Sequence, residues 1–175
     1  MPILYPYKQY GGIWTTSQVT DAVAGSNWPA AGTGLWSWGY NLYGELGLGN
    51  TTYFSSPKQV GSLRNWLNGA LGFGNALALK TDGTLWSWGQ NNYGQLGLGN
   101  VTYYSSPKQV GALTTWSSVA AGNNFSIAIK TDGTLWSWGF NGNGSLGLGN
   151  TTNYSSPKQI GALTNWLNVT AGRYN

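Results

Sequence analysis

The sequence contains no cysteine and no histidine, and only 7% of its 175 residues are charged. Without cysteine, the chain can form neither a disulfide nor a thiolate site. Without histidine, it lacks the commonest general base and the commonest metal ligand. We therefore expect no catalytic residue, no bound metal and no cofactor, and we expect the protein not to be an enzyme.

Positive charge is modest and long apolar runs are missing. The net charge of +4 is spread along the chain rather than gathered in a lysine or arginine cluster, which argues against nucleic-acid binding. No segment approaches the roughly 20 apolar residues of a membrane span. Residues 1–10 contain two prolines and no long apolar run, so we do not expect a signal peptide.

Glycine and large aromatic residues are abundant, with 28 Gly, 11 Trp and 11 Tyr. Glycine favours tight turns, and aromatic residues are enriched in strands. Three motifs also recur at a constant spacing of 50 residues. They start at Leu35 (Leu-Trp-Ser-Trp-Gly), Leu46 (Leu-Gly-Leu-Gly-Asn) and Ser55 (Ser-Ser-Pro-Lys-Gln), and each is repeated twice. Constant spacing predicts one structural unit that meets its neighbours in the same way each time.

Four short strands are expected in each unit. Residues 125–129 alternate large and small side chains, and the Asp-Gly pair in 131–133 predicts a hairpin turn into a return strand at 134–138. Residues 157–160 begin with proline, which is tolerated at a strand start or sheet edge. Residues 168–171 are predicted to form the inner strand of a following unit. Four strands in fifty residues are typical of a propeller blade.

The repeated motifs resemble those of the regulator-of-chromosome-condensation family. The resemblance rests on Lys-Thr-Asp-Gly-Thr-Leu-Trp-Ser-Trp-Gly, Leu-Gly-Leu-Gly-Asn and Ser-Ser-Pro-Lys-Gln, and covers residues 32–175. It implies an all-β propeller, usually of seven four-stranded blades. Where the family usually carries histidine at the head of the second strand, this chain has Asn75 and Phe125.

The repeats are too few for a closed seven-bladed ring in one chain. We divide the chain into an anchor or cap segment at 1–31 and a repeat domain at 32–175. The units lie near 32–66, 67–116 and 117–166, with a partial unit at 167–175. The first unit lacks its own second strand. An uncovered sheet edge presents unpaired backbone groups that can pair with another chain. We expect homo-oligomerisation or docking into a larger assembly.

The head of the chain has a different character from the repeats. Residues 16–25 read as a short helix, with Ser17 near its N-cap and Gly25 as its stop. Residues 10–29, with Gly-Ile-Trp near the start and Trp-Pro at the end, resemble a leader of structural proteins of tailed phages. This resemblance implies a virion anchor, and a cap for the first blade is compatible with it.

Few residues suggest chemistry, and each has a simpler structural interpretation. Asp82 and Asp132 precede glycine in equivalent turns, where aspartate bonds nearby backbone. Glu45 has no second carboxylate beside it in the sequence pattern, so no catalytic pair is indicated. The glycine-rich loops lack the Gly-Lys-Ser/Thr of a phosphate-binding loop. We interpret the repeated lysines, at 58, 108 and 158 and at 80 and 130, as a solvated rim.

The aromatic residues are the main candidates for both core and contact roles. One set of tryptophans is predicted to form the core between blades: Trp36, Trp38, Trp66, Trp86, Trp88, Trp116, Trp136, Trp138 and Trp166. A second set, of tyrosines on long loops, is predicted to contact a partner: Tyr43, Tyr53, Tyr93, Tyr103 and Tyr104.

Two functions fit this sequence. The first is a non-enzymatic component of a tailed-phage virion, on the tail or exterior, with loops that contact a host-surface glycan or protein. The alternative is a cellular, cytoplasmic protein-interaction scaffold of the same repeat family. Guanine-nucleotide exchange, which the resemblance also implies, ranks third, because half a ring would lack most of the face that it needs.

Overall fold

The computed structural model describes residues 12–15 and 34–172. Every secondary-structure element in these ranges is a β-strand. The helix expected at 16–25 lies outside the described residues. Among the residues that are described, no helix has the length and apolar character needed to cross a membrane.

The eleven strands of the described residues form three antiparallel sheets. Their orders are β1-β2-β3, β4-β5-β6-β7 and β11-β10-β9-β8, so each strand pairs with its neighbour in sequence. The bounds are β1 Gly12–Thr15, β2 Leu35–Gly39, β3 Phe54–Gln59, β4 Trp66–Leu71, β5 Asn75–Lys80, β6 Leu85–Gly89, β7 Tyr104–Gln109, β8 Trp116–Ala121, β9 Phe125–Lys130, β10 Leu135–Gly139 and β11 Tyr154–Gln159.

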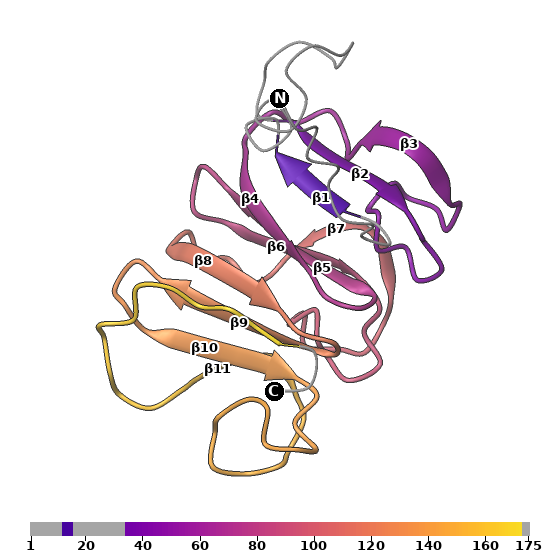
Figure 1. Cartoon of the computed structure of the whole chain (residues 1–175). Coiled ribbons are helices and arrows are strands. Elements are labelled where there is room, and N and C mark those ends of the chain that lie inside the picture. The colour runs from indigo at the N-terminus through magenta and orange to yellow at the C-terminus, as the bar shows by residue number, and fades with distance from the viewer. Residues whose placement is uncertain (1–11, 16–33, 173–175) are drawn as a thin grey trace, which may run out of the picture.

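The sheets follow one another as blades of an incomplete propeller (Figure 1). Strands β4 and β8 begin the second and third blades and lie beside each other, and β1 of the first blade lies beside β4. The prediction of an all-β chain with four-stranded, propeller-type blades in an open arc is therefore confirmed.

The hairpin between β5 and β6 forms at the predicted Asp-Gly pair. Gly83 adopts a φ of 78°, a left-handed conformation that glycine adopts without strain. A carboxylate oxygen of Asp82 accepts hydrogen bonds from the backbone N–H and the hydroxyl of Thr84. The same bonds recur between Asp132 and Thr134. These contacts account for both aspartates as turn residues.

A tryptophan of each later blade packs into a loop of the blade before it. Trp88 and Trp138 are fully buried. The indole N–H of Trp88 donates to the carbonyl of Glu45, and that of Trp138 donates to the carbonyl of Gln95, both at 2.9 Å. A Cβ at Gly47 would lie 2.7 Å from the Trp88 nitrogen. Glycine is required there because the ring lies directly against the backbone.

The serine between the paired tryptophans holds the loop of its own blade. Ser37, Ser87 and Ser137 are fully buried. The Ser87 hydroxyl donates to the carbonyl of Leu96 at 2.7 Å, and the other two serines bond the equivalent carbonyls of their own units. The small side chain therefore serves as a hydrogen-bond donor as well as leaving room for packing.

The first blade takes a strand from the head of the chain. Gly12 pairs with Trp38 and Ile13 with Ser37. In the second blade, β5 pairs with β6 in the same register, with Ala76 opposite Trp88. Strand β1 therefore occupies the second-strand position that the first repeat lacks. Part of the segment at 1–31 is thus built into the first sheet.

Two predictions at the end of the arc are wrong. Residues 168–171 form no strand, and Trp166, expected in the core, is 38% exposed, whereas the equivalent Trp66 and Trp116 are 3% and 4% exposed. The backbone N–H of Trp166 still donates a hydrogen bond to the carbonyl of Gly133. Among the described residues, no following blade pairs with this segment or covers it.

We expect Trp88→Phe to lower the free energy of unfolding by about 2 kcal/mol, because it removes buried apolar volume and leaves the Glu45 carbonyl without its donor. Chemical denaturation monitored by circular dichroism measures this change. Trp166→Phe is the matched control, and an exposed position predicts a change within about 0.5 kcal/mol. Equal losses in the two variants would contradict the packing described above.

Candidate interaction surface

Aromatic side chains gather where the third strand of each blade ends and its outer strand begins. Tyr40 directly follows β2, and Phe140 directly follows β10. The group spans all three blades, and we call it the aromatic row. It consists of Tyr40, Tyr43, Tyr53, Tyr93, Tyr103 and Phe140.

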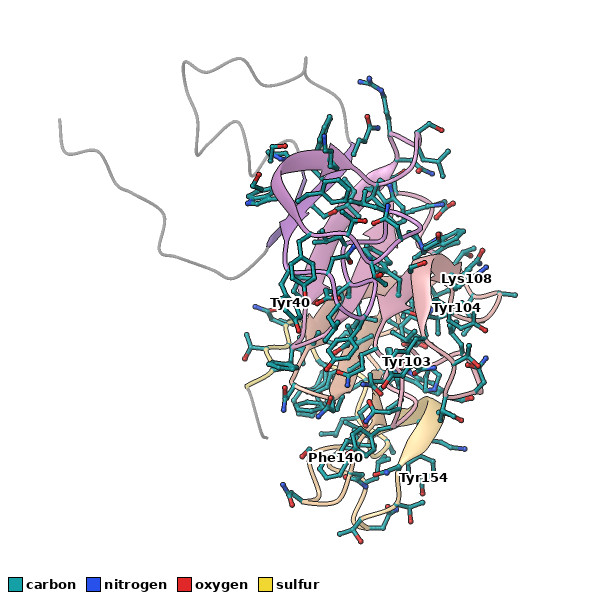
Figure 2. All side chains as sticks on the ribbon, turned by 90° about the vertical axis from the view of Figure 1, so that its right-hand side faces the viewer. Tyr40, Tyr103, Tyr104, Lys108, Phe140 and Tyr154 are labelled. Carbon is teal, nitrogen blue, oxygen red and sulfur yellow. The ribbon has the colours of Figure 1, made fainter. Side chains whose placement is uncertain are left out.

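The row is held together by three ring pairs. Tyr40 and Tyr53 lie 4.8 Å apart between ring centroids, within the first blade. Tyr43 meets Tyr103 of the second blade edge-on at 5.9 Å. Tyr93 meets Phe140 of the third blade at 4.9 Å. Figure 2 shows Tyr40, Tyr103 and Phe140 following one another along the arc.

The row remains accessible although its rings touch. Tyr53 is 54% exposed, and Tyr40 and Tyr103 are 41% and 43% exposed. Tyr43 and Tyr93 are half-buried. A hydrogen bond with Tyr53 raises the pKa of Tyr40 above its usual range. Four of the five tyrosines predicted as contact residues therefore lie together, and Tyr40 and Phe140 join them.

Tyr104 differs from that prediction because it does not lie on a loop in the row. It begins β7 and is half-buried. The ammonium of Lys108 lies 5.4 Å from the centroid of the Tyr104 ring, and the Tyr104 hydroxyl accepts a hydrogen bond from the side-chain amide of Asn100. Figure 2 places Tyr104 and Lys108 side by side, away from Tyr40. Side chains alternate faces along a strand, and this position points away from the row.

A buried asparagine organises the loop that carries the row. The side chain of Asn41 donates to the carbonyls of Asn50 and Thr52 and accepts a hydrogen bond from the N–H of Leu46. Asn91 makes the same three bonds in the second blade. This asparagine was not predicted from the sequence, although an asparagine two positions after Trp-Gly in every unit is a visible signal.

Glu45 lies in the same loop, beneath the row. One carboxylate oxygen accepts a hydrogen bond from the backbone N–H of Tyr43 at 2.8 Å, whereas the other is buried and has no partner among the described residues. Burial raises the pKa of Glu45 above its usual range, and the backbone hydrogen bonds oppose that shift. Gln95 occupies the equivalent place with both polar atoms bonded, to Tyr93 and Asn92. The carboxylate is therefore the less well satisfied of the two.

The repeated lysines fall into two different environments. Lys58, Lys108 and Lys158 are exposed on the outer strands, each about 5.4 or 5.5 Å from an aromatic centroid on the same strand. Charged side chains of this kind protect a sheet edge. Lys80 differs from the predicted solvated rim, because it is only 4% exposed and lies between two tryptophans.

We expect Glu45→Gln to raise the free energy of unfolding at neutral pH by about 1 kcal/mol, because the amide avoids burying a charged oxygen without a partner. The raised pKa fixes the sign of the pH dependence. Protonated Glu45 contributes fully to the stability of the folded state below the pKa of the unfolded chain, about 4.3. This contribution is lost as the pH rises through the higher pKa of Glu45 in the folded protein.

Denaturation of both proteins across this pH range measures the effect. The difference between them should grow as the pH rises from acid to neutral. Gln95→Glu is the reciprocal variant, and it should destabilise the second blade in the same pH range. A glutamine variant that is less stable at neutral pH than the parent would contradict the assignment.

Solved structures with this arrangement are known. One is Prp20p from Saccharomyces cerevisiae, which was studied for its crystal structure and its binding to Gsp1p and histones. It matches with 26% identity and a TM-score of 0.67, over 74% of this chain and 34% of that one. The same protein bound to Kap60 matches with 26% identity and a TM-score of 0.66 over 74% and 33%. Human WBSCR16 matches with 27% identity and a TM-score of 0.62 over 73% and 35%.

This chain spans about a third of the length of each of those proteins. No curated protein matches it. The model of the regulator of chromosome condensation (RCC1) repeat matches residues 34–74, 82–129 and 132–175, and a second model of the same repeat matches residues 116–145. The matched segments cover most of the sequence and the three blades described above, and the chain therefore belongs to the RCC1 repeat family.

Proposed function

We propose that this chain is a non-enzymatic scaffold that binds a partner protein through the aromatic row. The observation that carries the proposal is the continuity of the row, because ring pairs join the loops of successive blades into one surface. Exposed Leu42 and Val101, at 49% and 59%, come from the same loops. Tyrosine beside aliphatic residues on a rigid support is typical of the central part of protein interfaces.

Protein is favoured over glycan by the way the rings lie. Tyr43 and Tyr103 meet edge-on, at an interplanar angle of 79°, and Tyr40 and Tyr53 are tilted at 37°. Stacking on sugars uses flat ring faces, whereas the rings here are tilted against each other and do not form one flat platform. A partner side chain can fill the spaces between such rings, and this favours a protein surface.

The similar structures support binding as a class of function. Prp20p was studied for its binding to Gsp1p and histones, and yeast RCC1 (Prp20) was solved with Kap60 bound. Those partners belong to proteins about three times as long as this chain, so they name no partner here. They support the general role of these blades as a platform for proteins.

The tailed-phage assignment stays a prediction. It rests on residues 10–29, of which the structure describes only Gly12–Thr15. The cytoplasmic alternative and assembly with other copies are likewise predictions. Mass spectrometry of purified virions from the source would test the first of these. Recovery of the chain at stoichiometric amounts is expected if residues 1–31 anchor it in a particle, and its absence from virions would contradict that role.

We expect the triple variant Tyr40→Ser, Tyr53→Ser, Tyr103→Ser to weaken partner binding by at least about tenfold, because the exposed rings of the row supply most of its apolar contact area. The partner is first enriched from a lysate of the source on the parent chain, and then purified. Titration of the purified partner measures its dissociation constant for each variant.

The matched control changes Lys58, Lys108 and Lys158 to serine, because these exposed side chains lie on the outer strands rather than in the row. Circular dichroism checks that both variants fold. Binding that falls only in the tyrosine variant supports the proposal. Unchanged binding in that variant, or an equal loss in the lysine variant, would contradict it.

A further inference from the structure

Two pockets lie between successive blades, at the end of the strands opposite the aromatic row. The first, between blades one and two, has a volume of about 330 Å³ and is lined by Lys80, Trp66 and Trp86 together with Leu48 and Pro107. The second, of about 380 Å³, is lined by Lys130, Trp116 and Trp136 together with Leu98 and Pro157. These volumes are at the lower end of the range for small-ligand sites.

The two pockets have the same composition. Every lining residue of the first has a counterpart of the same type in the second, 50 positions later. The units differ at many other places, such as Leu67 and Ser117, or Glu45 and Gln95. Both pockets therefore present the same chemistry, and a ligand of one should fit the other.

A buried lysine that has no ion-pair partner among the described residues lies in the wall of the first pocket. Lys80 is 4% exposed, and its nitrogen lies 3.6 Å from the ring centroid of Trp86 and 4.9 Å from that of Trp66. Desolvation lowers the pKa of Lys80, and the charge of Asp82 opposes that shift. The carboxylate of Asp82 is occupied by Thr84. Lys130 has the same two ring contacts, at 3.7 and 5.1 Å.

Each pocket is also lined by a tryptophan whose indole N–H has no acceptor among the described residues. The indole N–H groups of Trp66 and Trp116 are buried and have no acceptor. The other tryptophans of the second blade differ, because Trp86 donates to Thr84 and Trp88 donates to the carbonyl of Glu45. A buried donor without an acceptor is costly. Each pocket thus combines one cation and one free N–H donor.

The residues that line the pockets indicate the charge and polarity of a ligand that would fit them. A negatively charged group that accepts hydrogen bonds would satisfy both donors, and a single ammonium matches a single negative charge. No acidic residue lines either pocket. Leu48, Pro107 and Trp86 make the remaining wall apolar, which favours an anion carried on a hydrocarbon group over a hydrated phosphate.

We propose that each of these two pockets binds a carboxylate carried on an apolar group, with the lysine ammonium pairing the charge and the indole N–H of Trp66 or Trp116 donating to an oxygen. The site goes beyond the proposed scaffold role, because it lies at the other end of the strands and does not involve the aromatic row. A free carboxylic acid and an acidic side chain of a peptide share this chemistry.

Titration with hydrocinnamate, followed by NMR of the indole N–H signals, tests the proposal. We expect the signals of Trp66 and Trp116 to move downfield with a dissociation constant of about 1 mM. Those of Trp88 and Trp138 should stay in place, because their N–H groups already have acceptors. Hydrocinnamyl alcohol, which lacks the charge, should move neither pair. A capped tetrapeptide with one glutamate, compared with its glutamine version, distinguishes a peptide from a free acid.

Lys80→Met should weaken binding at Trp66 by at least about tenfold and leave binding at Trp116 unchanged, so that the second pocket reports that the variant is folded. Lys130→Met should do the reverse, and Lys80→Arg should restore binding. Lys158→Met, on an exposed outer strand, is the control for net charge. No shift at either indole, equal shifts with the alcohol, or unchanged binding in both methionine variants would overturn the proposal.

Discussion

The structure depends on the insertion of one tryptophan of each later blade into a loop of the preceding blade. Trp88 is fully buried against Gly47, and its indole N–H bonds the carbonyl of Glu45. Trp138 repeats the contact with Gly97 and Gln95. One indole thus buries a large apolar area and satisfies a backbone carbonyl. At the end of the arc, a Cβ at Gly147 would meet only Ile160, at 3.7 Å, and no indole of the described residues packs there.

The same loop builds both candidate binding surfaces. Residues 40–43 supply two tyrosines of the aromatic row, and residues 47–49 line the pocket at the other end of the strands. Between them, the Glu45 carbonyl holds the next blade's indole. Asn41 ties the two ends of the loop together from its buried position. A change in how the blades pack would therefore move the row and the pocket together, although they lie apart.

The repeat made most of the fold predictable from the sequence. A constant spacing of 50 residues, an Asp-Gly hairpin turn and paired tryptophans were sufficient to predict four-stranded blades in an open arc. The tyrosines at 43, 53, 93 and 103 could be predicted as candidate contact residues because the sequence places them in long loops. Tyr104 and Trp166 were misplaced for different physical reasons. The first is ordered by strand pairing and Lys108, and the second is exposed because no following blade covers it in the part of the chain that the structure describes.

The sequence by itself determined the number of units, their strands and turns, and the absence of histidine and cysteine chemistry, because these follow from composition and local periodicity. Tertiary structure alone decided which side chains of different units meet. The pairing of Tyr43 with Tyr103, the place of β1 in the first blade and the enclosure of Lys80 between Trp66 and Trp86 are examples. The first of these depends on how one blade is rotated against the next, and the other two depend on which strands pair within a blade. The local periodicity of the sequence encodes neither.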